Sequence, residues 1–257
     1  MSVAIVGMGY VGQQMLKIFP DALQIDPPKG LGDYEQTDGC ELSIVCVPTP
    51  MLEDGSCDTS IVEYVVPLLR SKRILIRSTV TPGTCDRLAE SVGYKIVFAP
   101  EYLGESKYYT PPQYPQPTDP LQHGFMILGG TDADCSAVAD LFLPRLGPCT
   151  RFRFVTRKEA ELIKYAENAF FAVKVTFANQ LRQICEAAGV NYHRVREGWL
   201  DDPRVGPMHS AAFARAPGFD GKCLPKDTAA LAAYCRSLDI DPLLLDAAIK
   251  QNESLKA

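Results

Sequence analysis

The first 26 residues constrain the fold more than any other stretch of this chain. A short apolar run at residues 3–6 leads into Gly7-Met8-Gly9-Tyr10-Val11-Gly12, and a segment with helical spacing of its apolar residues follows as far as Phe19. A second apolar run at residues 23–25 ends at Asp26. This order predicts a strand, a glycine turn, a helix and a second strand, which together begin a βαβ unit.

The glycines of this turn have separate physical roles. Gly7 permits the turn, Gly9 lets the backbone approach a pyrophosphate, and Gly12 allows the helix to pack closely on the strand. The helix N-terminus offers N–H groups and positive potential to the phosphates. Asp26 lies about 20 residues beyond the first glycine, where it can accept hydrogen bonds from an adenosine ribose and repel a 2'-phosphate. We therefore predict a dinucleotide site, formed by Gly7 to Gly12 with Asp26, that prefers NAD over NADP.

Apolar runs alternate with helix-like segments as far as residue 155, and this alternation predicts an α/β fold. Further strands are expected at 42–47, 73–76, 95–99, 125–128 and 149–155, and helices at 60–69, from 84 onward and at 133–143. Ser60 and Glu63 are spaced as a capping box for the first of these helices. The stretch from Asp26 to Leu42 is turn-rich and scarcely holds a crossover helix. We expect a Rossmann-like, doubly wound parallel sheet as an NAD-binding domain over residues 1–155.

The ends of three expected strands carry residues suited to ligand binding. One strand runs into Val47-Pro48-Thr49-Pro50, whose X-Pro pairs force an extended exit from the sheet. Others end at Ser78-Thr79-Val80 and at Pro100-Glu101-Tyr102-Leu103-Gly104-Glu105. Ligands of open α/β sheets bind at the carboxyl ends of strands, so these stretches are candidates for the site.

Residues 156–257 are expected to form an all-α domain that begins with a long helix. Thr156 and Glu159 form a second capping box, and no helix breaker follows before Gly189, so the helix would span about 50 Å. One face carries a stripe of apolar residues: Ile163, Ala166, Phe170, Val173, Phe177, Leu181 and Ile184. Core packing is the simplest interpretation of this stripe. A helix of this length and character also favours a two-fold homodimer.

Two polar residues of the same helix, Lys164 and Asn168, are four positions apart and share one face. They are either a solvated edge or two donors of a binding site. The cysteine turn Gly218-Phe219-Asp220-Gly221-Lys222-Cys223-Leu224-Pro225-Lys226-Asp227 comes later in this domain. A thiolate is a strong nucleophile, and the neighbouring lysines favour it over the thiol. The alternative is that Cys223 is a small buried hydrophobe, as most cysteines are.

Charge and cysteine usage narrow the classes of function. The net charge of −5 and the absence of any Lys/Arg run argue against a nucleic-acid binder. No apolar run approaches a membrane span, and the N-terminus resembles a buried strand more than a signal peptide. The nine cysteines form no CxxC pair and no metal-ligand pattern with the three histidines, which favours reduced thiols in a cytoplasmic protein. The proline-rich stretch 108–120 is expected to be a stiff surface loop rather than a polyproline ligand.

Taken together, these motifs resemble the UDP-glucose/GDP-mannose dehydrogenases, in which they occur in the same order. The resemblance extends over nearly the whole chain, and the cysteine turn is its most specific part. It implies NAD-dependent, four-electron oxidation of the primary alcohol of a sugar nucleotide to a carboxylate. The intermediate aldehyde is captured as a thiohemiacetal on the cysteine that matches Cys223, a second oxidation gives a thioester, and water releases the acid.

The resemblance also assigns roles to individual residues. Lys164 and Asn168 would donate to the oxygen that gains negative charge, Glu101 would be the base for thioester hydrolysis, and Thr79 and Asp227 would position the water or proton. Arg204 resembles an arginine that reaches substrate from the other subunit. The expected cofactor contacts are Gly7, Met8, Gly9, Tyr10, Val11, Gly12, Asp26, Val47, Pro48, Thr49, Pro50, Ser78, Thr79, Val80 and Glu105. The expected substrate contacts are Glu101, Tyr102, Leu103, Glu105, Lys164, Asn168, Arg204, Gly218, Phe219 and Gly221.

Two features depart from the family pattern. Family members carry a third, α/β domain that closes over the nucleotide, and this sequence stops at Ala257 without one. The crossover after Asp26 is also short. Two alternatives therefore stay open beside the four-electron enzyme: a two-electron dehydrogenase of β-hydroxyacid type with Lys164 as base, and an NAD-binding dimerisation module that lacks turnover or needs a separate nucleotide-binding partner.

Overall fold

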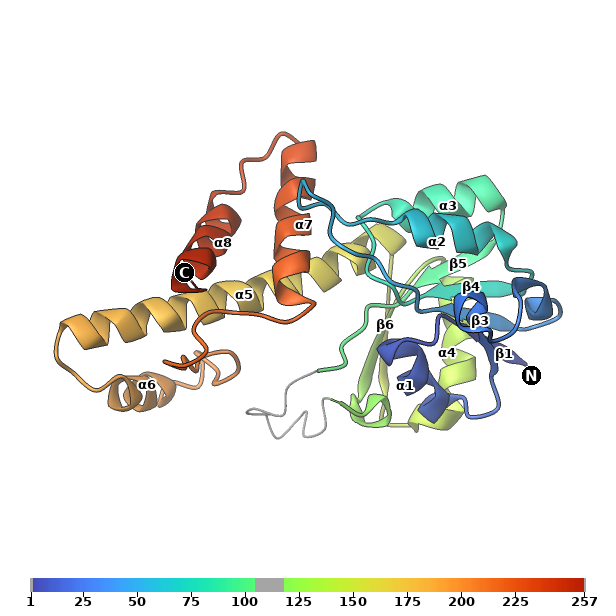
Figure 1. The fold of residues 1–257 in the computed structure, drawn as a ribbon. Coiled ribbons are helices and arrows are strands. Elements are labelled where there is room, and N and C mark those ends of the chain that lie inside the picture. The colour runs from blue at the N-terminus through green and yellow to red at the C-terminus, as the bar shows by residue number, and fades with distance from the viewer. Residues whose placement is uncertain (1, 105–117, 257) are drawn as a thin grey trace. The chain divides into compact units, whose positions relative to one another are not determined.

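The computed structural model describes residues 2–104 and 118–256, which form two compact units (Figure 1). Among the described residues, the first unit runs from the N-terminus to Lys164, except for Met51–Ser56. That short segment belongs to the second unit, together with the chain from Tyr165 onward. Each unit has its own packing, so we describe them one at a time.

The described residues of the first unit form a seven-stranded sheet in the order β2-β1-β3-β4-β5-β6-β7. The strands are β1 (Val3–Val6), β2 (Leu23–Ile25), β3 (Leu42–Val45), β4 (Arg73–Ile76), β5 (Lys95–Phe98), β6 (Phe125–Gly129) and β7 (Arg151–Val155). All neighbours from β2 to β5 are parallel, so the carboxyl ends of these strands meet at one edge of the sheet. The expected α/β architecture with a Rossmann-like sheet is confirmed.

The far side of the sheet departs from the purely parallel arrangement that we expected. β6 pairs antiparallel with β5 at Phe98 and Gly129, and β7 pairs parallel with β6. β6 and β7 are therefore antiparallel to the other five strands. An apolar run identifies a buried strand but not its direction, and an antiparallel neighbour requires no crossover to the opposite edge.

Helices cover both faces of this sheet (Figure 1). α1 (Tyr10–Ile18) and α4 (Asp132–Leu146) pack on one face, where Met15 and Phe142 belong to a shared core cluster. α2 (Ser60–Val65) and α3 (Thr84–Val92) pack on the other face through a separate cluster. Between β2 and β3 the structure has two short 3-10 helices, Pro27–Lys29 and Tyr34–Thr37, in place of a full crossover helix. The expectation of a shortened connection there is confirmed.

The start of α2 differs from the capping box expected at Ser60 and Glu63. Ser60 is already the first helical residue, and Thr59 is the N-cap. The Thr59 hydroxyl donates to Glu63 Oε1 at 2.9 Å, and the backbone N–H of Ser60 donates to Asp58 Oδ1 at 2.9 Å. The capping box was wrong because a preceding aspartate takes the role of N-terminal acceptor, which is common for Asx residues. The helix ends in a 3-10 turn, Val66–Leu68, that contains Pro67.

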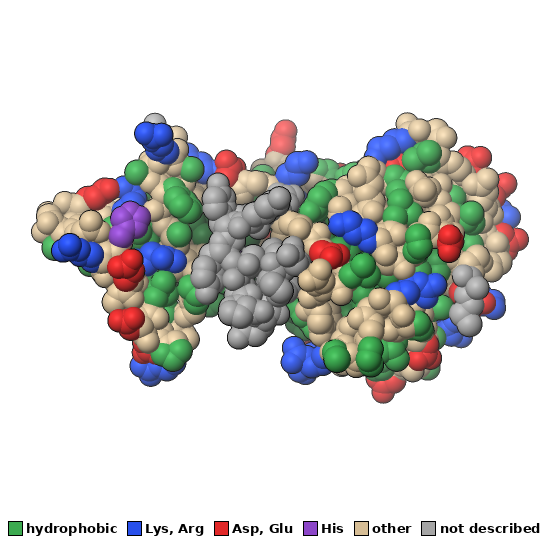
Figure 2. Space-filling view, turned by 90° about the horizontal axis from the view of Figure 1, so that it is seen from below, with side chains coloured by type: hydrophobic (Ala, Val, Ile, Leu, Met, Phe, Trp, Pro, Cys, Tyr) green, Lys and Arg blue, Asp and Glu red, His purple; other side chains and the backbone are tan. Residues whose placement is uncertain are grey.

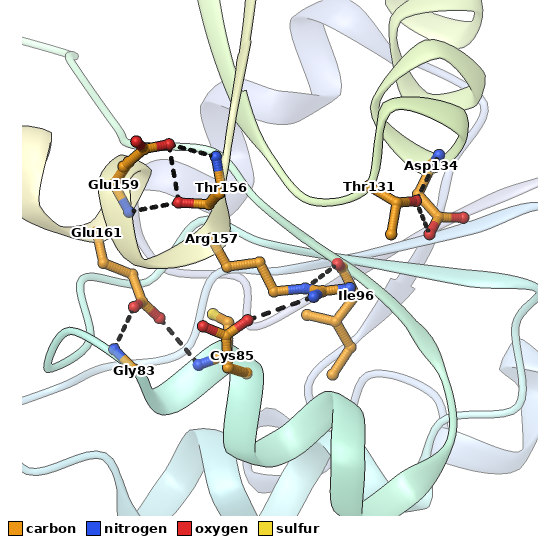
Figure 3. A network of polar contacts seen from close by, with 10 residues as sticks. Gly83, Cys85, Ile96, Thr131, Asp134, Thr156, Arg157, Glu159 and Glu161 are labelled. Atoms are coloured by element: carbon orange, nitrogen blue, oxygen red, sulfur yellow. Dashed lines mark hydrogen bonds and ion pairs between the residues drawn. The ribbon is translucent and has the colours of Figure 1, made fainter.

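The long helix α5 (Arg157–Ala187) begins at the capping box that the sequence predicts. The N–H of Thr156 donates to Glu159 Oε2 at 2.7 Å, and the N–H of Glu159 donates to the Thr156 hydroxyl at 3.3 Å (Figure 3). One turn later, the buried Glu161 accepts hydrogen bonds from the N–H groups of Gly83 and Cys85, at 2.5 and 2.9 Å. Glu161 thereby caps α3, and the first turns of α5 are fixed within the first unit.

The second unit is helical. It contains the rest of α5, α6 (Tyr192–Leu200), α7 (Leu224–Ser237) and α8 (Leu243–Lys256). The buried face of α5 in this unit combines four small residues, Ala169, Ala172, Ala178 and Cys185, with Tyr165, Asn168 and Asn179. Three large members of the predicted stripe, Phe170, Phe177 and Ile184, are instead 60%, 52% and 57% exposed. Core packing within this chain was therefore the wrong interpretation for these three side chains.

The surface carries charges of both signs. On the face drawn in Figure 2, Lys and Arg side chains are interspersed with Asp and Glu.

Within residues 2–104 and 118–256, no group of three or more His, Cys, Asp or Glu side chains could hold a metal ion. No helix in this part of the chain is long and apolar enough to cross a membrane.

Candidate active site

The glycine turn after β1 depends on the absence of side chains at two positions. Gly7 has φ +91°, and a Cβ added there would lie 2.8 Å from the carbonyl oxygen of Cys46. A Cβ at Gly12 would lie 2.0 Å from the carbonyl oxygen of Gly7. At Gly9 an added Cβ meets nothing within 4 Å, and φ is −78°. The turn thus needs Gly7 and Gly12 for its own packing and keeps the space above Gly9 open.

Two alanine substitutions separate these roles. We expect Gly12→Ala to lower the free energy of unfolding by about 1–3 kcal/mol, because its methyl overlaps a backbone oxygen. Gly9→Ala should change that free energy by less than about 0.5 kcal/mol. It should weaken NADH binding roughly tenfold or more, because the methyl occupies space that a pyrophosphate needs. Urea denaturation and fluorescence titration with NADH measure the two effects, and unchanged NADH affinity in Gly9→Ala would contradict the cofactor role.

Asp26 follows β2 and is bonded to the glycine turn. Its Oδ2 accepts the backbone N–H of Met8 at 2.8 Å. Lys29 Nζ lies 3.2 Å from the same Oδ2 and donates to the carbonyl oxygen of Met8 at 2.7 Å. The sequence placed Asp26 beside the turn, but it gave no sign that Lys29 would fold back onto both partners.

The predicted ligand-binding stretches after β3 and β4 lie together at the carboxyl edge of the sheet. The Ser78 hydroxyl donates to the carbonyl oxygen of Val47 at 2.7 Å, and Ser78, Val80 and Thr49 are buried. Pro48 and Pro50 are exposed, and Thr79 is partly buried. The hydrogen bond of Ser78 therefore holds the exits of two neighbouring strands against each other.

Glu101, which follows β5, is buried in an ion pair that the sequence did not predict. Arg77 Nε donates to Glu101 Oε2 at 3.1 Å, and Arg77 Nη2 donates to the same oxygen. Glu101 Oε1 accepts the N–H groups of Tyr102 and Leu103, both at 2.8 Å. Burial raises the pKa of Glu101, but the charge and hydrogen bonds of Arg77 and the Leu103 N–H outweigh it, so the pKa lies below its usual value. Glu101 is thus held as a carboxylate.

Lys164 belongs to the same unit and lies close to this carboxylate. Its side chain is buried, and Nζ donates to the backbone carbonyl oxygen of Glu101 at 2.5 Å. The ammonium also lies 5.5 Å from the centroid of the Tyr102 ring, which is within reach of a cation–π contact. Glu105, the last expected residue of this stretch, lies outside the described residues.

In the second unit, Asp227 is the centre of a buried polar cluster. Its side chain is 1% exposed. Asn168 Nδ2 donates to Asp227 Oδ2 at 2.6 Å, and Lys226 Nζ lies 2.5 Å from Asp227 Oδ1. The sequence assigned Lys226 to the thiolate of Cys223, whereas its ammonium pairs with the neighbouring carboxylate. Asn168 and Lys226 together compensate the buried charge of Asp227.

Cys223 is exposed and is the N-cap of α7, with Pro225 in the first helical turn. The sequence predicted a cysteine turn that extends to Asp227, but α7 begins at Leu224, so the turn is shorter than expected. The Leu224-Pro225 pair is the signal that marked the earlier start, since proline is favoured at the first helical positions. A helix N-terminus carries positive potential and stabilises a negative charge placed there.

The turn before Cys223 is fixed by a residue of α8. Gly218 and Gly221 have φ of +79° and +86°, a region that favours glycine. Asn252 Oδ1 accepts the N–H of Phe219 at 2.7 Å, and Asn252 Nδ2 donates to the Phe219 carbonyl at 3.0 Å. The Phe219 side chain is buried. Asn252 was missed by sequence reasoning because it lies 33 residues from its partner.

Arg204 is separate from this cluster in its contacts. Its side chain is 89% exposed and pairs with Asp202, with Nε donating to Oδ1 and to Oδ2 at 3.0 Å. It is therefore held by a neighbour two residues away in the loop between α6 and α7.

Comparison with known protein families identifies the family of this chain. Residues 30–140 match the sequence profile of the UDP-glucose/GDP-mannose dehydrogenase family, NAD binding domain, and residues 158–254 match that of the central domain of the same family. The chain belongs to the UDP-glucose/GDP-mannose dehydrogenase family. The match of its first unit to the NAD binding domain of this family confirms NAD as the predicted cofactor.

Curated relatives of the family agree with this assignment. The UDP-glucose 6-dehydrogenase of Haloferax volcanii is 32% identical over 243 residues, which cover 86% of this chain and 54% of that protein. The GDP-mannose 6-dehydrogenase of Pseudomonas syringae is 30% identical over 249 residues, which cover 88% of this chain and 54% of that protein. The chain thus spans about half the length of the curated relatives that it matches.

Solved structures of the family share the fold. The structure of a UDP-glucose dehydrogenase from Pyrobaculum islandicum superposes with a TM-score of 0.81 at 24% identity, over 98% of this chain and 68% of that chain. Within the first unit, the residues after β1, β2, β3 and β4 fit a dinucleotide of the kind that the family uses. The decisive observations are the space over Gly9 and the carboxylate of Asp26 at the end of β2.

Proposed function

We propose that this family member catalyses the NAD-dependent oxidation of the primary alcohol of a sugar nucleotide to a carboxylate, with Cys223 as the covalent nucleophile. The observation that carries this proposal is an exposed cysteine at the N-terminus of α7, one turn before a buried aspartate that an asparagine and a lysine hold. The thiolate form of a cysteine is the nucleophile that attacks a carbonyl carbon. The names of the relatives, UDP-glucose and GDP-mannose 6-dehydrogenases, support a sugar nucleotide as substrate.

The overall reaction is balanced by two hydride transfers and one water. NAD, which the residues after β1 and β2 would hold, would supply the hydride acceptor of both oxidations, so each alcohol that becomes an acid should give two NADH. The Cys223 sulfur adds to the aldehyde carbon to form a thiohemiacetal, and loss of the second hydride together with the hydroxyl proton leaves a thioester. Water then adds to the thioester carbonyl, the C–S bond breaks, and Cys223 leaves as thiolate for the next turnover.

Lys164 and Asn168 are proposed to stabilise the oxygen on the reacting carbon. A lysine ammonium has three donors and an asparagine amide two, so the hydrogen bonds that they make to Glu101 and Asp227 do not exhaust them. Donors held by buried partners need little reorganisation when negative charge develops on a substrate oxygen, and this preorganisation is the main source of electrostatic catalysis.

Glu101, Thr79 and Asp227 are proposed to handle the water and its proton. Glu101 is a carboxylate at neutral pH, because Arg77 keeps its pKa low, and it can accept a proton from a water that attacks the thioester. A carboxylate with a low pKa is a weak base. Thr79 and Asp227 are proposed to position the water that attacks the thioester. Further substrate contacts are proposed from Tyr102, Leu103, Glu105, Arg204, Gly218, Phe219 and Gly221.

Product stoichiometry tests the reaction. With NAD and a panel of UDP- and GDP-sugars, we expect NADH to form in a ratio of two per acid, measured by absorbance together with chromatography of the product. One NADH per turnover would contradict the thioester route and favour a two-electron dehydrogenase of β-hydroxyacid type. No NADH with any sugar nucleotide would favour an NAD-binding module, and adding separate nucleotide-binding domains would then test whether turnover requires a partner.

A homodimer through α5 is the second part of the proposal. Phe170, Phe177 and Ile184 leave an apolar face of this helix exposed, and such faces on long helices favour pairing with a second copy. We expect Phe177→Glu to raise the dimer dissociation constant by roughly tenfold or more, measured by analytical ultracentrifugation. Tyr64→Glu, at a 66% exposed aromatic of α2, is the matched control and should leave the dissociation constant unchanged. A wild-type chain that sediments as a monomer would contradict the proposal.

A further inference from the structure

Among the described residues, four N–H donors of the first unit fill the acceptor positions of the Glu101 carboxylate. Arg77 Nε donates to Oε2 at 3.1 Å, and Arg77 Nη2 donates to the same oxygen. The backbone N–H groups of Tyr102 and Leu103 donate to Oε1, both at 2.8 Å. A carboxylate has about four lone-pair positions, two on each oxygen. The positions at which Glu101 could receive a proton are therefore occupied by these donors.

This arrangement limits what Glu101 can do as a base. A general base must offer a lone pair to the water from which it takes a proton, within hydrogen-bond reach. The side chains of Arg77 and Glu101 are 8% and 10% exposed, so water has little access to Oε2 from solvent. As long as both contacts of Arg77 are made, Glu101 is ionised, but its lone pairs are committed to other donors.

Of the donors on Glu101, the Arg77 side chain is the one that can leave without a change in the backbone. Tyr102 and Leu103 directly follow Glu101 in the chain, so their N–H groups move with it. Arg77 follows β4, and its backbone N–H is held by the Val45 carbonyl oxygen at 2.9 Å. The arginine side chain has several rotatable bonds, and it borders a cavity that Tyr102 also lines.

We propose that Arg77 is a gating residue for thioester hydrolysis: its guanidinium must withdraw from Glu101 Oε2 before a water can lose its proton to that oxygen. The inference rests on the proposed function, in which Glu101 takes this proton and Cys223 leaves as thiolate. Withdrawal opens a buried ion pair, so the open state is a minor population and hydrolysis is slowed by the same factor. The two oxidations do not use this carboxylate as a base, so the closed pair delays hydrolysis alone.

A single turnover measures the hydrolysis step by itself. The whole chain is mixed with NAD and one equivalent of UDP-glucose, or of the UDP- or GDP-sugar that gives NADH fastest, and quenched in acid at timed intervals. NADH absorbance follows the oxidations, and intact-protein mass spectrometry gives the fraction of chains that carry the thioester. In the wild type we expect the thioester to accumulate after the second NADH has formed. Hydrolysis that keeps pace with the second oxidation would overturn the inference, whatever the variants do.

Arg77→Lys opens this gate in part and keeps the counter-charge of Glu101. A lysine ammonium lacks the planar fork that places two N–H groups on one oxygen, so a lone pair of Oε2 becomes vacant. We expect thioester hydrolysis to be faster by roughly fivefold or more, while the first NADH forms within about twofold of the wild-type rate. Structural damage would slow the steps instead. Adding Glu101→Gln to this variant should abolish the acceleration, because the gate acts only through the carboxylate.

Arg87→Lys is the matched control, because Arg87 pairs with Glu63 in the same unit and its side chain is 62% exposed. It should leave every rate at the wild-type value, and circular dichroism melting curves verify that each variant is folded. Hydrolysis in Arg77→Lys that is equal to or slower than in the wild type overturns the inference while the proposed function stands. A wild-type chain that forms neither a thioester nor a second NADH would instead overturn the proposed function.

Discussion

Replacing Cys223 with serine is expected to reduce acid formation by roughly a thousandfold or more. A serine hydroxyl is far less ionised and less nucleophilic than a cysteine thiol, so the aldehyde would no longer be captured. The measurement is the yield of carboxylate and of NADH per sugar nucleotide, with a carbonyl-trapping reagent added to collect released aldehyde. The expected signature is a loss of acid together with at most one NADH per substrate.

The matched control for this variant is Cys149→Ser. Cys149 is the other cysteine classed as exposed in the described part of the chain, and it lies in the first unit, in the turn between α4 and β7. Its replacement should leave the acid yield unchanged. A Cys223→Ser protein that still gives two NADH per acid at the wild-type rate would rule out the thioester route, whatever Cys149→Ser does.

Replacing Arg77 with methionine is expected to lower the free energy of unfolding by about 3–5 kcal/mol, because the buried carboxylate of Glu101 loses its counter-charge. Urea denaturation at neutral pH measures this change. The double variant with Glu101→Gln should recover most of the loss, because no buried charge then remains. Arg87→Met is the control: its partner Glu63 is 44% exposed, and the expected cost is below about 1 kcal/mol.

The pH dependence of stability provides an independent check on the same pair. In the wild type the pKa of folded Glu101 lies below its usual value. The ion pair of Arg77 and Glu101 therefore stabilises the fold at pH values above the pKa that Glu101 has in the unfolded chain. That contribution is lost as the pH falls through the folded-state pKa. In Arg77→Met, burial still raises the pKa of Glu101 and only the Leu103 N–H and the charge of Lys164 oppose it, so we expect the pKa to rise and stability to increase as the pH falls and Glu101 becomes protonated. Equal acid profiles for the two proteins would contradict the assignment of this pair.

The strands of the first unit could be predicted to within one or two residues. Apolar runs such as Val3–Val6 end at a glycine or proline, and both the composition and the breaker are local in the sequence. The direction of β6 could not be predicted, since the side chains of a short buried strand are similar in either orientation. Whether this chain or a second copy covers Phe170 and Phe177 stayed open in the sequence for a related reason. Helical periodicity identifies an apolar face, but it does not say whether the same chain or another covers it.

The residues of the candidate site were easier to predict from the sequence than their hydrogen-bond partners and charge states. Motif order identified Glu101 and Asp227, but the state of a buried carboxylate depends on partners that are distant in sequence. Arg77 lies 24 residues from Glu101, and Asn168 lies 59 residues from Asp227. Cys223 was predicted as a surface thiol, and its position as a helix N-cap followed from Leu224-Pro225, a local signal that sequence reasoning had not used.

The two hydrogen bonds between Asn252 and Phe219 have a consequence for the order in which the protein is made. Residues on both sides of the cysteine turn leave the ribosome well before Asn252 does, because 33 residues separate it from Phe219. The buried N–H and carbonyl of Phe219 therefore have no side-chain amide to bind while α7 is being synthesised. The loop that carries the nucleophile therefore reaches its final shape only after Asn252 of α8 has been synthesised.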